Sequence, residues 1–166
     1  MIFETERLRI RKLKETDKDL FFEMMGNPNV MLPIPVQPMS KVESDEKFLE
    51  FIAEKNPRLT NIWAAAKKEN DEFIGLCGFL INDENDDELA YRLREKNWGA
   101  GYGTEIAKGL IEHGFNKMFS KKITADVNIE NKKSVKILEK FMFAVKEFYN
   151  EKDQCTDRRY AIYKNI

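Results

Sequence analysis

The hydrophobic pattern at the start of the chain changes its period twice. Apolar and charged residues nearly alternate over residues 8–13, which predicts a strand, and the apolar spacing of residues 20–25 then predicts a helix. A second helical pattern runs from 40 to 52. Between the two helices lie four of the five prolines, within residues 28–38. Because proline fixes φ and lacks an amide donor, we predict a long irregular loop there.

Three strand-like segments follow in the middle of the chain. Residues 62–66 and 73–81 flank a turn-rich stretch at 69–71, and residues 89–93 follow an acidic loop at 82–87. Short connections rich in Asn and Asp between such segments are typical of neighbouring antiparallel strands. We therefore predict an antiparallel meander.

The period becomes helical after Gly103. The helix predicted there has one apolar face, made of Ile106, Ala107, Leu110, Ile111, Gly114 and Phe115. A strand at 123–127, a helix at 134–141 and closing strands at 143–149 and 160–163 complete the pattern. The predicted fold class is α/β (α+β), with a single mixed, mostly antiparallel sheet of about six to seven strands and helices on both faces.

Composition limits the classes of function. A chain of 166 residues with 42% hydrophobic content can bury one core, so we expect a single domain over residues 1–166. Its 28 basic and 29 acidic side chains nearly cancel, which disfavours nucleic acid and anionic membranes as partners. Two cysteines and one histidine predict neither a disulfide framework nor a metal cluster. The lack of a long apolar run or hydrophobic leader favours a cytoplasmic protein.

Three glycines at alternate positions precede the helix that begins near Gly103. The loop consists of Trp98, Gly99, Ala100, Gly101, Tyr102, Gly103 and Thr104. Glycines let backbone amides approach a ligand, and the free amides at a helix N-terminus favour an anion, so the loop is a candidate pyrophosphate site. A tight turn before a closely packed helix is the alternative. A Walker loop is excluded because no lysine precedes Thr104.

The loop and its surroundings resemble the GNAT superfamily of N-acetyltransferases. The segment Glu88-Leu-Ala-Tyr-Arg-Leu93 and the glycine loop resemble its central motif. The tryptophan at the loop start, the opening Glu4-Thr-Glu-Arg-Leu8 and the segment Asn128-Ile-Glu-Asn-Lys-Lys-Ser134 resemble the ribosomal-protein alanine N-acetyltransferase (RimJ/RimL-like) branch. The resemblance implies a GNAT-like acyl-CoA N-acyltransferase fold and acetyl-CoA as cosubstrate, with no metal. It departs from the branch at Met142, where glycine is usual, and from many superfamily members at Leu138, where tyrosine is common.

The resemblance also implies a role for each site residue. Glu88 is the expected general base, although it ends an acidic run of the kind that is usually a solvated turn. Ser134 is the expected proton donor to the cofactor sulfur, or else a helix cap. Asn131 is expected to bond the pantetheine arm, unless it too caps the helix. The main chain of Leu93 is expected to pair with the pantetheine amides. Cys77, in an apolar strand, is expected to be packing rather than a nucleophile, so direct attack in a ternary complex is preferred.

The acceptor is the open part of the sequence-based hypothesis. We expect an amine, either a small molecule or a protein N-terminus, recognised from residues 27–40 and by the acidic turn. A polyamine, an amino acid and an aminoglycoside are all candidates, in a protein that is a monomer or homodimer. Fold resemblance transfers cofactor use better than acceptor identity. Two further alternatives are a non-catalytic acyl-CoA sensor and an interaction protein with no ligand.

Overall fold

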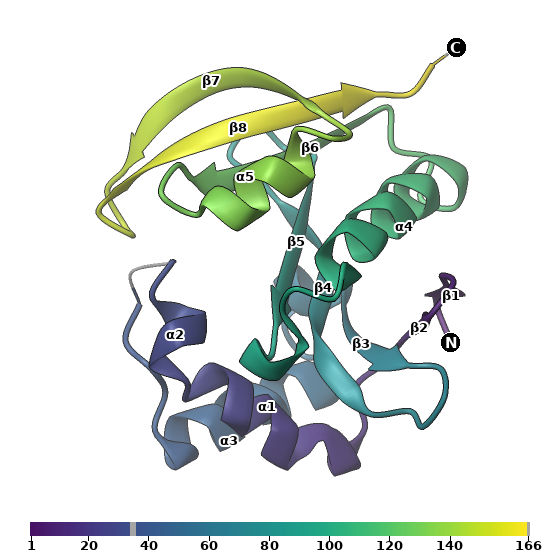
Figure 1. The fold of residues 1–166 in the computed structure, drawn as a ribbon, viewed down its shortest axis with the longest axis vertical. Coiled ribbons are helices and arrows are strands. Elements are labelled where there is room, and N and C mark those ends of the chain that lie inside the picture. Colours follow the sequence, from purple (N-terminus) through teal and green to yellow (C-terminus); the bar gives the residue numbers. More distant parts are fainter. Residues whose placement is uncertain (34–35, 166) are drawn as a thin grey trace.

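One eight-stranded sheet organises the protein (Figure 1). The computed structural model describes residues 1–33 and 36–165. The strands, in the spatial order β1-β2-β3-β4-β5-β6-β8-β7, are β1 (Phe3–Glu4), β2 (Leu8–Arg11), β3 (Ile62–Lys67), β4 (Phe73–Ile81), β5 (Asp87–Leu93), β6 (Lys122–Asn128), β7 (Phe143–Asn150) and β8 (Cys155–Tyr163). The mixed sheet is confirmed, with one or two strands more than expected. The two-residue β1 is too short to give a period in sequence.

The strands β5 and β6 form the one parallel pair in the described sheet, and they separate almost at once. Their register contains only Asp87 opposite Ile123 and Glu88 opposite Thr124. All other neighbouring strands pair antiparallel, including β4 with β5 along its full length from Asp87 to Leu93. Beyond Glu88 the edge of β5 that faces β6 is therefore without a strand partner. This divergence opens the centre of the sheet.

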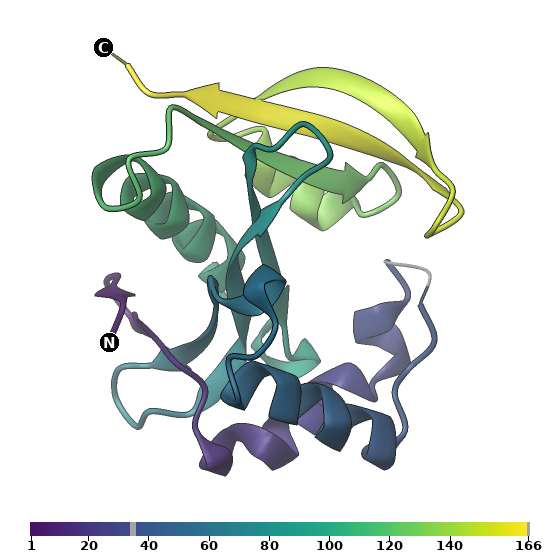
Figure 2. The same cartoon turned by 180° about the vertical axis from the view of Figure 1, so that it is seen from behind.

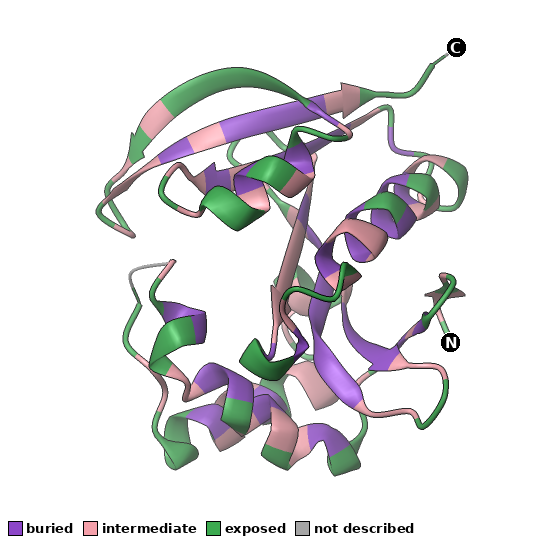
Figure 3. Ribbon diagram, in the orientation of Figure 1, coloured by how far each residue is buried: buried purple, intermediate pink, exposed green. Residues whose placement is uncertain are grey.

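Helices cover both faces of the sheet, as expected. The helices α4 (Tyr102–Asn116) and α5 (Lys132–Leu138) pack on one face, over a core that includes Ile10, Leu110 and Tyr160. The helices α1 (Lys18–Met25) and α3 (Lys41–Ile52) pack on the other. The second core is formed by apolar side chains of these two helices, of residues 30 and 31 between them and of the adjoining strands, namely Phe21, Met24, Met25, Val30, Met31, Phe48, Ala64, Phe73 and Leu76. Figure 3 shows the buried stripe of α4 facing the sheet.

The proline-rich segment is not irregular throughout. A four-residue helix, α2 (Pro28–Met31), forms at its start, so the expectation of a loop over residues 28–38 was wrong for these positions. Pro28 occupies the first turn, where its missing amide costs no hydrogen bond, and the Asn27 side chain accepts from the Asn29 amide at 2.9 Å. The part of that prediction that falls on residues 34 and 35 lies outside the described residues.

The turn between β7 and β8 projects over the side of the molecule where α2 lies (Figures 1 and 2). Most of the length of β7 is exposed. Boundaries elsewhere differ by a few residues from the sequence pattern: α5 ends at Leu138 rather than 141, and β8 begins at Cys155 rather than 160. No helix among those described is long and apolar enough to cross a membrane.

Candidate active site

A cavity of about 610 Å³ opens where β5 and β6 diverge. Its walls come from β5, β6, α2, α5 and the turn before β8. Of the residues expected in the site from sequence, those that line the cavity are Glu88, Leu93, Trp98, Gly103, Asn131 and Ser134. The other members of the glycine loop, Gly99, Ala100, Gly101, Tyr102 and Thr104, lie outside the cavity wall, around the N-terminus of α4.

The glycine loop ends at the N-terminus of α4 in a conformation that needs glycine. Gly99 and Gly101 have φ of 74° and 82°, in the left-handed region that other residues enter at a cost. Gly101 is the N-cap of α4, and no side chain of the described residues caps the helix there. The first amides of this 15-residue helix are therefore free to meet an anion.

The side chains of Arg7 and Trp98 hold the loop in place. The Arg7 guanidinium donates to the Ala100 carbonyl at 2.9 Å and to the Glu105 carboxylate at 2.8 Å, which ties the loop to the N-terminal segment. The Trp98 indole donates to the Leu93 carbonyl at 3.0 Å, so the tryptophan links the end of β5 to the loop. The carbonyl that was expected to serve the pantetheine arm thus already has one partner, although a carbonyl can accept a second hydrogen bond.

Basic side chains lie close to this loop. The Lys133 ammonium lies 4.8 Å from the centre of the Trp98 ring, and the Lys140 ammonium donates to the Thr104 hydroxyl at 3.3 Å. Both lysines come from or directly follow α5. Together with the helix N-terminus they give this end of the cavity a positive potential suited to phosphate groups.

The start of α5 is capped by Asn131 rather than by Ser134. The Asn131 side-chain oxygen accepts from the Ser134 amide at 3.4 Å, so the capping alternative applies to Asn131. The side-chain amide group of Asn131 remains available to the cavity that it lines. Ser134 lies inside the first turn of the helix, and its hydroxyl is not needed for capping.

Glu88 is set apart from the other acidic residues of its turn. Asp83 pairs with Arg159 at 2.7 Å, Asp86 pairs with Lys122 at 2.7 Å, and Asp87 accepts from the Ser120 hydroxyl at 2.5 Å. The Glu88 side chain makes no hydrogen bond or ion pair with any residue that the structure describes, and Glu88 lines the cavity. Glu88 therefore differs from the solvated carboxylates that are usual in an acidic turn.

The surroundings of Glu88 change its acidity. Burial is the largest cause, and the nearby Asp126 carboxylate adds to it, so the pKa of Glu88 rises from 4.5 to about 7. Arg159 opposes this rise. However, the Arg159 guanidinium is bound in two hydrogen bonds of 2.7 Å to Asp126, which reduces its influence on Glu88. A carboxyl group with a pKa near neutrality is suited to proton transfer.

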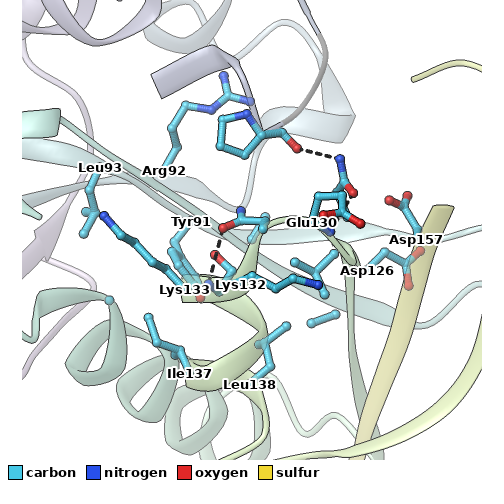
Figure 4. Close-up of a pocket in the computed structure, with 18 of the residues that line it drawn as sticks. Tyr91, Arg92, Leu93, Asp126, Glu130, Lys132, Lys133, Ile137, Leu138 and Asp157 are labelled. Carbon is cyan, nitrogen blue, oxygen red and sulfur yellow. Dashed lines mark hydrogen bonds between the residues drawn. The ribbon is translucent and has the colours of Figure 1, made fainter. Parts of the chain in front are cut away.

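Three residues on this wall were not identified from sequence. Asp126 lies on β6, and Asp157 lies on β8, opposite Asn128 in the β6–β8 register. They adjoin Glu88 only because β5, β6 and β8 are neighbours in the sheet. Figure 4 shows Asp126 and Asp157 at one end of the cavity and Arg92, the third, at the other. A sequence signal for such a set does not exist, since its members lie on three separate strands.

Tyr91 is a further residue that sequence reasoning did not assign. Its side chain points to the α5 side of β5 (Figure 4), and Tyr91 lines the cavity close to Ser134. The hydroxyl is buried, and its O–H has no acceptor within hydrogen-bonding distance among the described residues, although the Ser134 side chain interacts with its oxygen. Burial raises the pKa of Tyr91, with a smaller opposing effect of the Ser134 side chain, so the phenol stays protonated at neutral pH. A buried donor without an acceptor in a cavity is a candidate for contact with a ligand.

The remaining candidates have structural roles. Cys77 is buried in β4 away from the cavity, and burial raises the pKa of its thiol, which makes it a poor nucleophile. His113 stacks on the Phe3 ring with centroids 4.9 Å apart, outside the cavity. The described residues contain no group of three or more His, Cys, Asp or Glu side chains that could hold a metal ion.

Comparisons with known proteins agree with this architecture. The model of the acetyltransferase (GNAT) domain family matches residues 7–144. The chain is 30% identical over 162 residues to p20 of Bacillus licheniformis, an uncharacterized N-acetyltransferase, covering 96% of this chain and 91% of that protein. The chain therefore belongs to the GNAT family, and it is an acetyltransferase.

Solved structures with the same fold differ in their acceptors. The structure is similar to spermidine N-acetyltransferase from Vibrio cholerae in complex with CoA and spermine, with a TM-score of 0.76, 19% identity and 95% of each chain covered. It is also similar to RimL, a ribosomal L7/L12 alpha-N-protein acetyltransferase in complex with coenzyme A, with a TM-score of 0.76, 14% identity, and 98% of this chain and 97% of that chain covered. At these identities the likeness shows the fold and leaves the acceptor open.

Proposed function

We propose that this acetyltransferase uses acetyl-CoA to acetylate a primary amine by direct attack within a ternary complex. The observation that carries the proposal is Glu88, a carboxyl group with no protein partner among the described residues and a pKa raised to about 7, at the point where β5 and β6 diverge. The amine attacks the thioester carbonyl carbon and gives its proton to Glu88, directly or through water. A carbon–nitrogen bond forms and the carbon–sulfur bond breaks.

The cofactor has a consistent place on the α4 and α5 side of the cavity. The free amides at the N-terminus of α4, with Lys133 and Lys140 nearby, suit the pyrophosphate. Asn131 and the free edge of β5 offer hydrogen bonds to the pantetheine arm. CoA is bound in both neighbouring structures, which supports acetyl-CoA as the cosubstrate. The thioester then lies at the divergence of the strands, within reach of both faces of β5.

The departing thiolate needs a proton, and two hydroxyl groups are candidates to supply it. Ser134 keeps the role expected from the family resemblance, and Tyr91 lies beside it with a protonated and unpartnered phenol. Tyr91 comes from β5 rather than from the helix position where many superfamily members have tyrosine and this chain has Leu138. We propose that one of these two hydroxyl groups transfers its proton to the sulfur while the other donates a hydrogen bond to it.

The proposal also covers the branch of the GNAT superfamily to which the chain belongs and the boundaries of its domain. The tryptophan-glycine start of the loop, held by the Trp98 hydrogen bond to Leu93, supports a place near the ribosomal-protein alanine N-acetyltransferase branch. We treat residues 1–166 as one N-acetyltransferase domain. The acidic end of the cavity, with Glu88, Asp126 and Asp157, favours a cationic amine as the acceptor.

The test combines cofactor binding with turnover. Calorimetric titration with acetyl-CoA should give saturable binding, and a thiol-release assay with a panel of amines should show transfer above the rate of hydrolysis. Glu88→Gln should abolish most of the transfer while leaving binding intact. Glu69→Gln, an exposed carboxyl in a turn outside the cavity, is the matched control and should change neither.

The alternative of a non-catalytic sensor predicts a different result. Acetyl-CoA would bind, but no amine would be acetylated, and Glu88→Gln and Ser134→Ala would be without effect. An interaction protein with no ligand would not bind acetyl-CoA at all. Either result from a folded wild-type protein would refute the proposed function.

A further inference from the structure

Arg92 lies in the cavity with no acidic partner. Its guanidinium Nη1 contacts the Met25 thioether sulfur at 3.3 Å, and no carboxylate of the described residues lies within 4.0 Å of it. The surrounding protein desolvates the group, which lowers the pKa of Arg92, although part of its surface remains accessible from the cavity. A thioether is a weak acceptor that does not neutralise charge. Arg92 therefore has its donors largely unused.

The carboxylates of the neighbouring elements are occupied elsewhere. Glu95 accepts from the side-chain amides of Asn27 and Asn29, at 2.7 Å and 3.1 Å, and so joins the turn after β5 to α2. Asp153, which attracts Arg92 from a longer range, accepts from Asn150 at 3.1 Å. Neither carboxylate is paired with Arg92, so the Arg92 donors face the cavity.

Arg94, two residues later, shows how this fold treats an arginine that is structural. Its guanidinium is 1% exposed and binds Glu23 and Glu72, each at 2.8 Å. It also donates to the Phe73 carbonyl at 2.8 Å. Desolvated charges in proteins are normally satisfied in this way, because an unpaired one is costly. A desolvated charge that stays unpaired inside a ligand cavity is typical of a binding site.

The position of Arg92 relative to Glu88 defines the shape of the complementary ligand. Alternate residues of a strand share one face, so Glu88, Ala90 and Arg92 project to the same side of β5, opposite to Tyr91. The Cα atoms of Glu88 and Arg92 are about 13 Å apart along the strand, at about 3.3 Å per residue. Both side chains are long, so their charged groups can come closer together than their Cα atoms. The small Ala90 lies between them and lines the cavity. One end of this wall is acidic and the other is cationic.

We propose that the acceptor carries a carboxylate in addition to its amine, and that Arg92 binds this carboxylate while the amine lies toward Glu88. The inference rests on the proposed function and specifies its substrate class. A guanidinium binds a carboxylate through two parallel hydrogen bonds, which fixes orientation as well as affinity. A free amino acid and a peptide that begins with an acidic residue both have this chemistry. A polyamine does not, and its second ammonium would be repelled by Arg92.

The experiment compares matched acceptors and matched variants. Free amino acids with apolar, polar, basic and acidic side chains are each assayed beside their carboxamides, which keep the amine and lose the carboxylate. Amidated peptides that begin with Asp or with Asn, and spermidine, complete the panel. The variants are Arg92→Met, Arg92→Lys and, as a control at an exposed arginine outside the cavity, Arg58→Met. Binding of acetyl-CoA and thermal unfolding are measured for every protein.

We expect Arg92→Met to lower kcat/KM for carboxylate-bearing acceptors by at least about tenfold, mainly through KM, and to change it for carboxamides less than about twofold. Comparing each acceptor between wild type and variant removes the different basicity of the amines. Arg92→Lys should retain part of the preference, and Arg58→Met all of it. Arg92→Met should keep acetyl-CoA affinity and should keep or raise the melting temperature, whereas Arg94→Met should lower it.

Each other outcome decides between the two proposals. Efficient transfer to spermidine or to carboxamides, with acids no better and Arg92→Met affecting both equally, overturns the inference and leaves the amine acetyltransferase intact. Bound acetyl-CoA with no transfer to any acceptor overturns the proposed function. A preference for free amino acids over acidic peptides supports a small-molecule acceptor, and the reverse preference supports a protein N-terminus.

Discussion

The two sides of β5 are built in different ways. On the α5 side, the elements proposed to hold the cofactor come largely from two short segments, residues 98–104 with the helix that follows and residues 131–134. On the opposite side, the groups proposed to meet the acceptor come from β5, β6 and β8, with α2 closing the end. A local motif keeps its geometry when the rest of the chain varies, whereas a wall assembled from distant strands changes with any one of them. This difference explains how one fold serves neighbours with different acceptors.

The largest expected effect comes from the base on the acceptor side. Glu88→Gln should lower kcat/KM by about a hundredfold or more above neutral pH, because a positioned base contributes 10²–10⁴-fold. The pKa of about 7 predicts that the wild-type rate gains from ionisation of Glu88 as the pH rises through neutrality. The pH–rate profile of the wild type should rise as Glu88 ionises. The profile of the variant should lack this rise and show only the effect of deprotonation of the acceptor. Superimposable profiles would remove Glu88 from the mechanism.

The raised pKa of Glu88 should also make the free energy of unfolding depend on pH. A carboxyl whose pKa is raised from 4.5 to about 7 binds more protons in the folded than in the unfolded state between these two values. The free energy of unfolding should therefore fall as the pH rises through this window, by up to about 3 kcal/mol at 1.36 kcal/mol per unit. Urea unfolding of the wild type and Glu88→Gln across this window isolates the effect, which the variant should lack. A difference between the two proteins that is constant with pH would mean that Glu88 titrates normally.

On the cofactor side, the affinity for acetyl-CoA should depend on the backbone conformation of the glycine loop more than on the space around it. Gly101→Val should weaken acetyl-CoA binding by at least about tenfold, about 1.4 kcal/mol. A Cβ at Gly101 would meet only the Arg7 guanidinium at 3.4 Å, so the loss comes from the φ of 82° that valine resists. Ala100→Val adds the same side chain at a residue without positive φ, and should cost less in calorimetry. Unchanged affinity in folded Gly101→Val would place the phosphates elsewhere.

The smallest effect is expected at the two hydroxyl groups beside the proposed thiolate. Tyr91→Phe and Ser134→Ala should each lower kcat by about tenfold or less, and together by more, if both donate to the sulfur. Because the Tyr91 O–H has no acceptor among the described residues and would lose only its interaction with Ser134, its removal should cost little stability. Thermal unfolding beside steady-state kinetics checks both points. A destabilised Tyr91→Phe with normal kcat would make the phenol structural.

The sequence-based predictions were accurate for local elements and did not extend to the groups that distant strands bring together. The strands of the meander and the helix after Gly103 were predicted correctly because their periods are regular over several residues. The helix α2 was missed because proline was read as a breaker, although Pro28 occupies the first turn where its geometry suits a helix. The site residues named from sequence remain predictions, and the structure places six of them around one cavity.

The sequence by itself determined the elements, the glycine loop and the family resemblance, because each depends on residues that are close together in the chain. Only the tertiary structure decided that Glu88 is separated from its acidic turn, that Asp126 raises its pKa, and that Arg92 lies unpaired in the same cavity. The desolvation of these side chains and the interactions between their charges depend on which strands are neighbours and on where two strands diverge. The divergence of β5 and β6 sets both, and it has no signature in the local pattern of residues.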